Sequence, residues 1–439
     1  MIKWLLSYIG DQIDTKQFGG QKGNSITHYL IEFINFILYN QDMTNPHAVL
    51  TLLVDYSQAF NRCNHKTLIT MLSDMGVPRW LLEIVISFLS EREFLVRQKG
   101  KTSSKKRLPG GTPQGSRLGL FLFLVLINFA GFEPNTHVNN IGTEITKSHK
   151  NRRPISSTHM KYIDDLSLCV ALNLKENLVQ NPNKDIPRPL SYHERTGHEL
   201  PQDKNIIQHE FDKLQALSRD HGMVINQNKT KVMLFNPSKK FDFLPQIQTD
   251  EGSTIEVIEE TKLLGILVRS DMSWKSNTKM LCKKSYSRLW ILRNLARLGT
   301  SRESLIDVYF KQCRSVLELA APAWTPGLTK TEINQFERVQ KTACAIILGA
   351  NYQSYKLALK TLNMDTLESR REQISIKFAK KALKSEKFNH WFTNKEDKEP
   401  NIKTRSYGTK LKLKPVTFRK MKYKNSPLPY LTDLLNQQK

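Results

Sequence analysis

The sequence predicts an α+β fold, in which a part that mixes strands with helices is followed by a purely helical part. Up to about residue 268, β-rich runs alternate with helical periodicity, whereas beyond about Trp274 helical patterns take over. Near the C-terminus, residues 403–424 hold nine Lys or Arg and no acid. The predicted divisions are 1–268 for the mixed part, 269–385 for the helical part and 386–439 for a basic C-terminal tail.

The first strand is predicted at Ala48–Asp55, because the continuous β-rich run "AVLTLLVD" fits a strand buried on both faces. Residues 26–39 before it are apolar around most of a helical surface. Two further helices, "HKTLITMLSDMG" and "PRWLLEIVISFLSE", are separated by Gly76 and Pro78, and glycine is the residue type preferred just after a helix. The run "LGLFLFLVLI" is about half as long as a membrane span requires, so it predicts a buried helix.

The middle of the chain predicts a hairpin between two surface excursions. Residues 135–157 and 177–204 lack periodicity, and "HMKYIDDLSLCV" between them has two strand-type runs around Asp164 and Asp165. A helix follows in "NIIQHEFDKLQALSRDHG", and "TKVMLF" and "TKLLGILV" are interpreted as strands. The apolar residues of this helix recur at 3–4 spacing, namely Ile207, Phe211, Leu214 and Leu217.

The helical part shows two capping-box patterns, Thr300-x-x-Glu303 and Thr329-x-x-Glu332, at predicted helix starts. Residues 279–298 predict an amphipathic helix with a basic surface. Its predicted apolar stripe is Tyr286, Leu289, Leu292 and Leu295, and its basic residues include Lys283, Lys284, Arg288, Arg293 and Arg297.

The charge of the chain predicts a polyanionic partner. The 439 residues include 66 Lys plus Arg against 41 Asp plus Glu, a formal net charge of +25. This excess favours nucleic acid first and an anionic membrane surface second, and no membrane-embedded part is predicted. Because no signal peptide is evident and no CxxC occurs, we expect a non-secreted, intracellular protein with reduced thiols. The nucleus is the compartment that we expect within the cell. The cysteines are Cys63, Cys169, Cys282, Cys313 and Cys344.

Asp164 and Asp165 allow two interpretations. An adjacent acidic pair is ordinarily a solvated turn, yet two like charges repel unless something positive lies between them. Paired metal ligands are the alternative, and they require a third carboxylate. Asp55 is the candidate, although an acid after a buried strand can simply cap it. Three carboxylates on adjacent strands would hold two Mg²⁺, or Mn²⁺, for in-line phosphoryl transfer, and without metal one of them should be reluctant to ionise.

Five consecutive motifs carry a family resemblance. They are "LLVDYSQAFNRCNHKTLITML", "LPGGTPQGSRLGLFLFLVLIN", "YIDDLSL", "HGMVINQNKTKVMLF" and "TKLLGILVRSDMSW", with "SVLELAAPAW" and "YKNSPLPYLTDLLN" further on. In this order they resemble the reverse transcriptases of non-LTR retrotransposons, most closely the jockey-like group. The resemblance implies a right-hand polymerase: a palm of antiparallel sheet with helices, partial fingers, and an α-helical thumb.

The resemblance also implies residue roles. Asp55, Asp164 and Asp165 would be the catalytic metal ligands, and Lys229 would lie near the departing pyrophosphate. Phe60 would exclude a ribose 2′-OH, Gln114 and Gly115 would lie against the nascent base pair and template, and Leu264 and Gly265 would form the primer grip. Independently of the resemblance, the amphipathic pattern of residues 279–298 predicts that Lys283, Lys284 and Arg288 bind nucleic-acid phosphates, with a merely solvated basic face as the alternative. Core packing for Phe60, a solvated Lys229 and an ordinary strand at 264–265 are the alternatives. Gly110, Gly111 and Gly115 suit a close backbone approach.

Departures from the family pattern are few. Leu120 replaces a proline, Asn61 and Asn64 replace acids that bind no metal, and Gln21 stands where the family usually has a fingers arginine. We therefore expect a chain truncated at its N-terminus, with only part of the fingers.

The leading functional hypothesis is an RNA-directed DNA polymerase of a mobile element that adds dNTPs to a DNA primer on an RNA template. The alternatives are a non-catalytic nucleic-acid-binding remnant of such an element, and another right-hand polymerase such as an intron maturase or a telomerase-like enzyme. The sequence predicts no particular oligomeric state.

Overall fold

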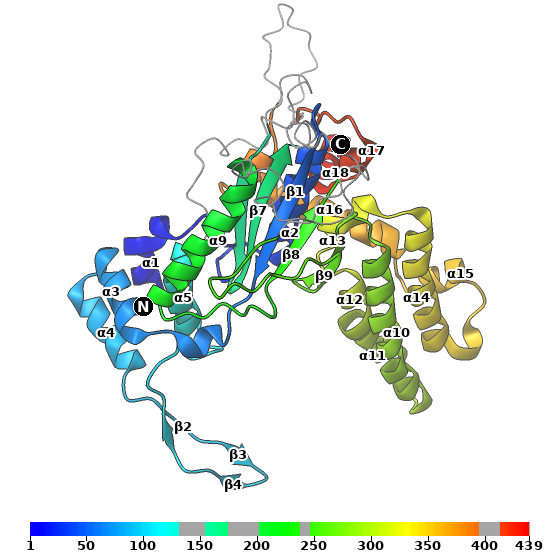
Figure 1. Ribbon diagram of the computed structural model, residues 1–439. Coiled ribbons are helices and arrows are strands. Elements are labelled where there is room, and N and C mark those ends of the chain that lie inside the picture. Colours follow the sequence, from blue (N-terminus) through cyan, green and yellow to red (C-terminus); the bar gives the residue numbers. More distant parts are fainter. Residues whose placement is uncertain (131–153, 174–201, 238–245, 395–412, 439) are drawn as a thin grey trace, which may run out of the picture.

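The computed structural model describes residues 1–130, 154–173, 202–237, 246–394 and 413–438 (Figure 1). Its centre is a four-stranded antiparallel sheet in the order β6-β7-β1-β8. The strands are β1 (His47–Val54), β6 (Ser157–Tyr162), β7 (Asp165–Asn173) and β8 (Lys231–Phe235). The two predicted surface excursions lie largely outside the described residues.

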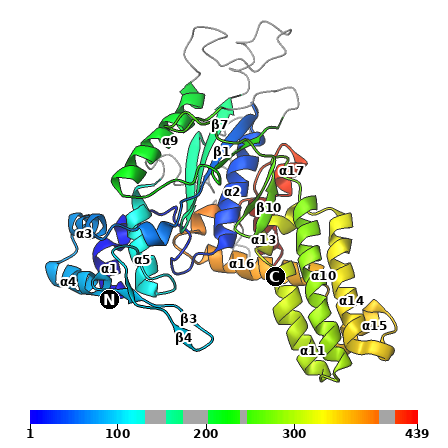
Figure 2. The same ribbon diagram turned by 60° about the horizontal axis from the view of Figure 1, so that its bottom comes forward.

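The sheet separates two apolar layers. β1 pairs with β7 on one side and β8 on the other, so its prediction as a buried central strand is confirmed. Because side chains alternate along a strand, Val49 faces a core shared with α2 (Ile26–Gln41), whereas Leu50 faces a core shared with α9 (Gln202–Asp220). Figure 2 shows α2 and α9 on opposite sides of the sheet.

A group of helices lies beside the sheet, at the left of Figure 1. They are α1 (Ile2–Ile9), α3 (His65–Asp74), α4 (Arg79–Leu89) and α5 (Arg117–Leu126). Gly76 ends the α3 turn with a φ of +85°, and Pro78 is the N-cap of α4, as the sequence indicates. The apolar run predicted as a buried helix forms α5, which is buried from Leu118 to Leu126 except at Leu120.

A narrow β-ribbon protrudes from this group at the bottom of Figure 1. It consists of β2 (Glu93–Phe94), β3 (Arg97–Gln98), β4 (Lys101–Thr102) and β5 (Lys106–Arg107), with β2 paired to β5 and β3 to β4.

The run "TKLLGILV" was predicted as one strand, and that prediction is wrong. It folds into a hairpin of β9 (Glu260–Leu263) and β10 (Ile266–Arg269). The turn residues Leu264 and Gly265 have φ values of +48° and +90°. Two consecutive positive φ values suit a two-residue hairpin, and the apolar leucine concealed the turn from pattern reading.

The helical part extends from Lys275 and lies at the right of Figure 1. Its α-helices are α10 (Lys275–Arg297), α11 (Arg302–Val308), α12 (Ser315–Leu317), α13 (Ala321–Trp324), α14 (Lys330–Leu348), α15 (Tyr355–Thr361) and α16 (Leu367–Leu383). The predicted capping box at Thr329 and Glu332 is confirmed. The one at Thr300 is wrong, because Ser301 is the N-cap of α11 and accepts a hydrogen bond from the Ser304 amide.

The packing face of α10 differs from the predicted stripe. Leu289 and Leu292 are buried, but Tyr286 is 39% exposed. The buried face continues instead through Ser285 and Cys282. A hydrophobicity pattern assigns the polar Ser285 to the surface. Its burial is possible because its hydroxyl donates a hydrogen bond to the Cys313 carbonyl at 3.3 Å.

The C-terminal residues that the structure describes pack against α2. They include α17 (Met421–Lys424) and α18 (Pro427–Gln437). Tyr423 donates to Asn35 at 3.2 Å, and the Trp391 indole donates to Glu32 at 2.7 Å. The predicted divisions at 268 and 385 stay predictions, but the described part of 386–439 is fixed to the core and is no free tail.

All five cysteines are free and buried, as predicted. Over the part of the chain that the structure describes, no helix has the length and apolarity to cross a membrane.

Candidate active site

The hairpin of β6 and β7 brings the predicted acids to one end of the sheet. Its central turn residues are Ile163 and Asp164, because Tyr162 pairs with Asp165. The expectation that both acids occupy the turn is therefore wrong for Asp165, which begins β7. Because β1 pairs Val54 with Leu166, continuing this register sets Asp55 opposite Asp165. Opposed residues of antiparallel strands point to the same face, so these two carboxylates share a face.

The three carboxylates are electrostatically coupled. Burial raises the pKa of Asp165 to about 6, and the negative charges of Asp164 and Asp55 contribute to the rise. Burial also raises the pKa of Asp164, where Asp55 adds to the effect and Lys229 opposes it. Burial is the larger cause of both shifts, and the charges of the neighbouring carboxylates add the mutual repulsion expected of metal-free acids that lie close together.

Lys229 lies beside Asp55, with its Nζ 3.5 Å from Asp55 Oδ2. That oxygen is buried and accepts no hydrogen bond. The loop before β8 positions the lysine, because the Asn226 amide donates to the Asp55 carbonyl and the Lys229 amide to the Asn226 carbonyl. A buried carboxylate oxygen without a donor requires a nearby cation, and the ammonium group supplies one.

The donor set suits a hard divalent cation in kind, because carboxylate oxygens are the ligands that Mg²⁺ prefers. The buried Asp55 oxygen without a hydrogen bond fits the same role. Within the described ranges, however, no three His, Cys, Asp or Glu side chains are already gathered as a metal-ligand group. Metal binding would therefore draw the carboxylates together and displace Lys229 from Asp55.

We expect Asp165→Asn to stabilise the metal-free protein. The folded chain raises the pKa of Asp165 to about 6, so the ionised carboxylate destabilises the fold above that pH. At pH 7.5 the variant should melt roughly 1–3 °C higher, and this gain should vanish below about pH 4, where the unfolded chain also holds the proton. Thermal unfolding followed by circular dichroism between pH 4 and 8 measures it. A variant that melts below the wild type at pH 7.5 would show that the ionised Asp165 carboxylate does not destabilise the fold.

Phe60 lies in the short 3-10 helix Ala59–Arg62 and is half-buried. Its ring stacks on Phe123 with centroids 4.4 Å apart. Gly111 supports it: a Cβ there would come within 2.9 Å of the carbonyls of Phe60 and Asn61, and its φ is +78°. Part of the ring therefore packs in the core and part remains exposed.

Gln114 and Gly115 are exposed in the loop before α5. A Cβ added at Gly115 would meet nothing within 4 Å of the protein itself, whereas Gly111 is packed against the backbone of residues 60 and 61, and a close approach of these glycines to template or base pair stays a prediction. Gly115 is required by its φ of +89°. Leu264 is half-buried, and a Cβ on Gly265 would lie 3.1 Å from Leu319, so this hairpin tip packs on the helical part. Their roles in binding stay predictions.

Sequence reasoning missed part of the exposed face of α10. Lys283 and Lys284 are exposed as predicted, whereas Arg288 donates a hydrogen bond to the Gln312 carbonyl at 2.7 Å. Trp290 is 65% exposed, and together with Tyr286 it interrupts a row of exposed basic residues. We name this row the α10 stripe: Lys279, Lys283, Tyr286, Trp290, Arg293 and Arg297. Its 3–4 spacing is legible in the sequence and places the six residues on one face.

The ribbon was also missed, although the basic run "RQKGKTSSKKR" is its sequence signal. Its strands are exposed throughout. Phe94, Leu95 and Val96 are exposed beside the lysines and arginines. This pairing of cations with apolar side chains on a protruding element is typical of a macromolecular contact.

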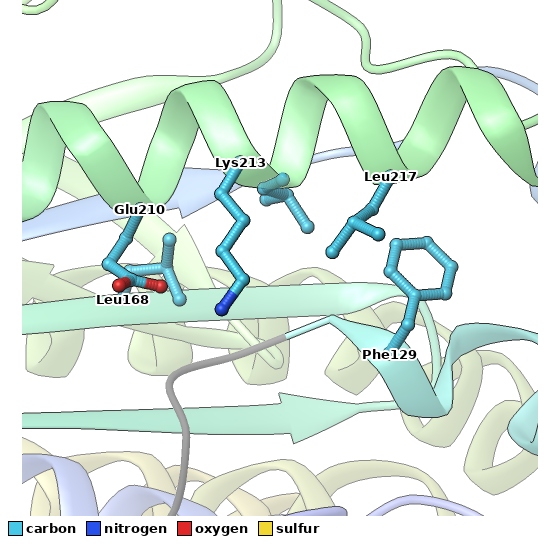
Figure 3. Close-up of a pocket in the computed structure, with 6 residues that line it drawn as sticks. Phe129, Leu168, Glu210, Lys213 and Leu217 are labelled. Carbon is cyan, nitrogen blue, oxygen red and sulfur yellow. The ribbon is translucent and has the colours of Figure 1, made fainter.

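A small pocket lies between α9 and β7 (Figure 3). It is lined by Phe129, Leu168, Glu210, Lys213, Leu214 and Leu217, and its volume of about 10 Å³ is that of a single water. Leu168 faces the α9 layer, whereas Cys169 faces the α2 layer. Since Asp165 shares the alternation of Cys169, the pocket lies on the other face of the sheet from Asp165 and Asp55.

An antiparallel sheet with three coupled carboxylates at one end, followed by a helical part, defines a polymerase-type palm and thumb. The model of the family described as "Reverse transcriptase (RNA-dependent DNA polymerase)" matches residues 1–266. The chain belongs to this family, and the predicted fold class is confirmed.

Two relatives refine this placement. The chain is 23% identical over 369 residues to the probable RNA-directed DNA polymerase from transposon BS of Drosophila melanogaster, a match that covers 82% of this chain and 35% of that protein. It is 36% identical over 109 residues to the RNA-directed DNA polymerase from mobile element jockey of the same organism, covering 25% of this chain and 12% of that one. The predicted kinship with jockey-like reverse transcriptases is confirmed. The chain spans about a third of the length of the transposon BS protein.

Among solved structures, the chain is similar to apo telomerase from Candida tropicalis, with a TM-score of 0.39 and 11% identity over 87% of this chain and 57% of that one. Telomerase from Candida albicans, solved with a fragment of telomeric RNA, gives a TM-score of 0.35 and 11% identity over 88% of this chain and 54% of that one.

Proposed function

We propose that this chain is an RNA-directed DNA polymerase, a nucleotidyltransferase that adds dNTPs to the 3′-OH of a DNA primer paired with an RNA template. Asp55, Asp164 and Asp165 hold two Mg²⁺, for which Mn²⁺ can substitute. The observation that carries the proposal is the coupling of these carboxylates at one end of the β1–β7 pair. Membership of the reverse transcriptase family supports it.

The bound metals would lower the pKa of the primer hydroxyl and neutralise charge on the leaving pyrophosphate. The chain's own residues then have separable tasks. Asp55 anchors the site from β1, while Asp164 and Asp165 complete it from the turn and β7. Lys229, whose ammonium lies 3.5 Å from Asp55, is proposed to leave Asp55 when metal binds and to donate a proton to the leaving pyrophosphate.

Phe60 is proposed to exclude ribonucleotides, because it follows Asp55 by five residues and its ring is only partly buried. We expect Phe60→Val to lower the preference for dNTPs over rNTPs by about tenfold or more, since it removes the bulk that a 2′-OH would meet. Steady-state kinetics with dCTP and CTP on one template measure this ratio. An unchanged ratio with normal dCTP incorporation would assign Phe60 to core packing on Phe123.

The basic surface is proposed to bind the template and primer. The net charge of +25 favours binding to the phosphates of a nucleic-acid backbone. Exposed basic residues are grouped on the α10 stripe and on the ribbon. A non-catalytic remnant is not favoured, because the chain belongs to the reverse transcriptase family and is similar to RNA-directed DNA polymerases of mobile elements. Because the proposed reaction requires a DNA primer, we also propose that the protein acts in the nucleus.

Primer extension tests the proposal. A 5′-labelled DNA primer on an RNA template is incubated with the chain, dNTPs and Mg²⁺, and Ca²⁺ replaces Mg²⁺ in the control. Extension that requires Mg²⁺ supports the proposal. Tight binding of the hybrid without extension in either Mg²⁺ or Mn²⁺ would favour the remnant.

A further inference from the structure

The turn that carries Asp164 has an unfavourable backbone conformation. Ile163, the residue before it, has a φ of +63°. A β-branched side chain at positive φ is a genuine outlier, and such a residue persists only where its surroundings fix it. Because Asp164 and Asp165 follow directly, the direction of both carboxylates depends on what holds Ile163.

Gln17 supplies that hold through one buried side-chain amide. Its Oε1 accepts hydrogen bonds from the Ile163 amide at 3.0 Å and from the Gly19 amide at 2.9 Å. Its Nε2 donates to the Ile163 carbonyl at 3.3 Å. The residue is only 1% exposed. Both backbone polar groups of Ile163 are thus satisfied by a single side chain that both donates and accepts.

The segment around Gln17 is itself anchored to β6. The Phe18 amide donates to the Lys161 carbonyl at 2.7 Å, and the Lys161 amide donates to the Lys16 carbonyl at 2.9 Å. Asp14 accepts from His159 and pairs with Lys161, each at 2.6 Å. The support under the turn is therefore a segment bonded to β6 through an isolated bridge between Gln17 and Lys161.

Gly19 shows how closely this segment is packed against the turn. A Cβ at Gly19 would lie 2.5 Å from the Ile163 nitrogen and 2.9 Å from the Tyr162 carbonyl carbon. Any other residue would push the segment and the Gln17 amide away from the turn.

We infer that Gln17 is a positioning residue, which holds the Ile163 turn so that Asp164 and Asp165 can converge on a metal ion. The inference rests on the proposed function of these acids. Gln17 would act on the acids through the backbone of Ile163, to which its side chain is bonded, and would not itself ligate the metal.

Mn²⁺ binding to the full chain, measured by the free-ion signal in electron paramagnetic resonance, tests the inference without relying on turnover. Gln17→Met keeps the length and loses all three hydrogen bonds, and Gln17→Asn keeps the amide but is too short to reach. We expect both to weaken Mn²⁺ binding about tenfold, with RNA–DNA hybrid affinity unchanged. Using two variants preserves the test if one fails to fold.

Gln41→Met is the matched control. Gln41 is also buried, at 5% exposure, and its amide donates to the carbonyl of Phe235 at 3.1 Å, away from the acids. This variant should lose thermal stability and retain Mn²⁺ affinity, so a general loss of packing is distinguished from a loss of positioning. Wild-type Mn²⁺ affinity in either folded Gln17 variant would overturn the inference.

Asp164→Asn separates this inference from the proposed function. If Asp164→Asn weakens Mn²⁺ binding and the Gln17 variants do not, only the positioning role fails. If Asp164→Asn leaves Mn²⁺ binding unchanged, the assignment of the metal site to these acids is wrong.

Discussion

Asp164→Asn is expected to reduce primer extension by about a thousandfold or more while leaving the affinity for an RNA–DNA hybrid nearly unchanged. The substitution is close to isosteric, so the turn geometry should survive. It removes a carboxylate from the proposed metal site, which would hold divalent cations against the reacting phosphate. Hybrid binding is proposed to depend on the α10 stripe and the ribbon, which the substitution does not touch.

Single-turnover extension and hybrid binding by fluorescence anisotropy measure the two effects separately. Asp307→Asn serves as a control for the loss of one carboxylate, because Asp307 is exposed and pairs with Lys311 within α11 and the adjoining helical turn. Extension by Asp164→Asn at more than a tenth of the wild-type rate would remove Asp164 from the set of metal ligands.

Neutralising the α10 stripe is expected to weaken hybrid binding by roughly tenfold or more near 0.1 M salt. The variant Lys279→Ala, Lys283→Ala, Arg293→Ala removes three exposed cations from one helix face. If each neutralises a phosphate, the slope of log affinity against log salt should fall by about 2–3. Arg288 is left in place, because its bond to the Gln312 carbonyl gives it a structural role as well.

The matched control removes the same charge from the other helices of this part: Lys330→Ala, Lys341→Ala, Lys356→Ala. These lysines are exposed on α14 and α15. Their loss lowers the net charge equally but should change the slope little. Equal slopes for the two triple variants would mean that only total charge matters, and that the stripe is an ordinary solvated face.

The sheet and the acids were predictable because their signals are local. A continuous apolar run in β1 requires burial on both faces, and Asp55 and the Asp164–Asp165 pair lie at the ends of such runs. Antiparallel pairing of β1 and β7 then sets Asp55 opposite Asp165, whereas the three acids as metal ligands stay a prediction. The resemblance of the five motifs to a known family added roles for individual residues, which composition alone does not indicate.

The structural features that the sequence did not predict are ones that a local hydrophobicity pattern does not carry. Ser285 is buried because a carbonyl 28 residues away accepts its hydroxyl, and Tyr286 is exposed as a consequence of that packing. Leu264 turns a predicted strand into a hairpin through a positive φ that leucine rarely adopts. Gln17 lies 146 residues from Ile163, and nothing in its own neighbourhood indicates the pairing.

The central claim is that Asp55, Asp164 and Asp165 together hold the catalytic metals. Anomalous diffraction from Mn²⁺ in crystals of the chain with a hybrid, a dNTP and a 3′-deoxy primer tests it most directly. If these acids hold the metals, two peaks should appear about 3.5–4 Å apart, bounded by the three carboxylates, with the Lys229 ammonium withdrawn from Asp55. Manganese peaks at other side chains in the presence of bound dNTP, or Lys229 still paired to Asp55 with no peak beside it, would show that the three acids do not hold the metals.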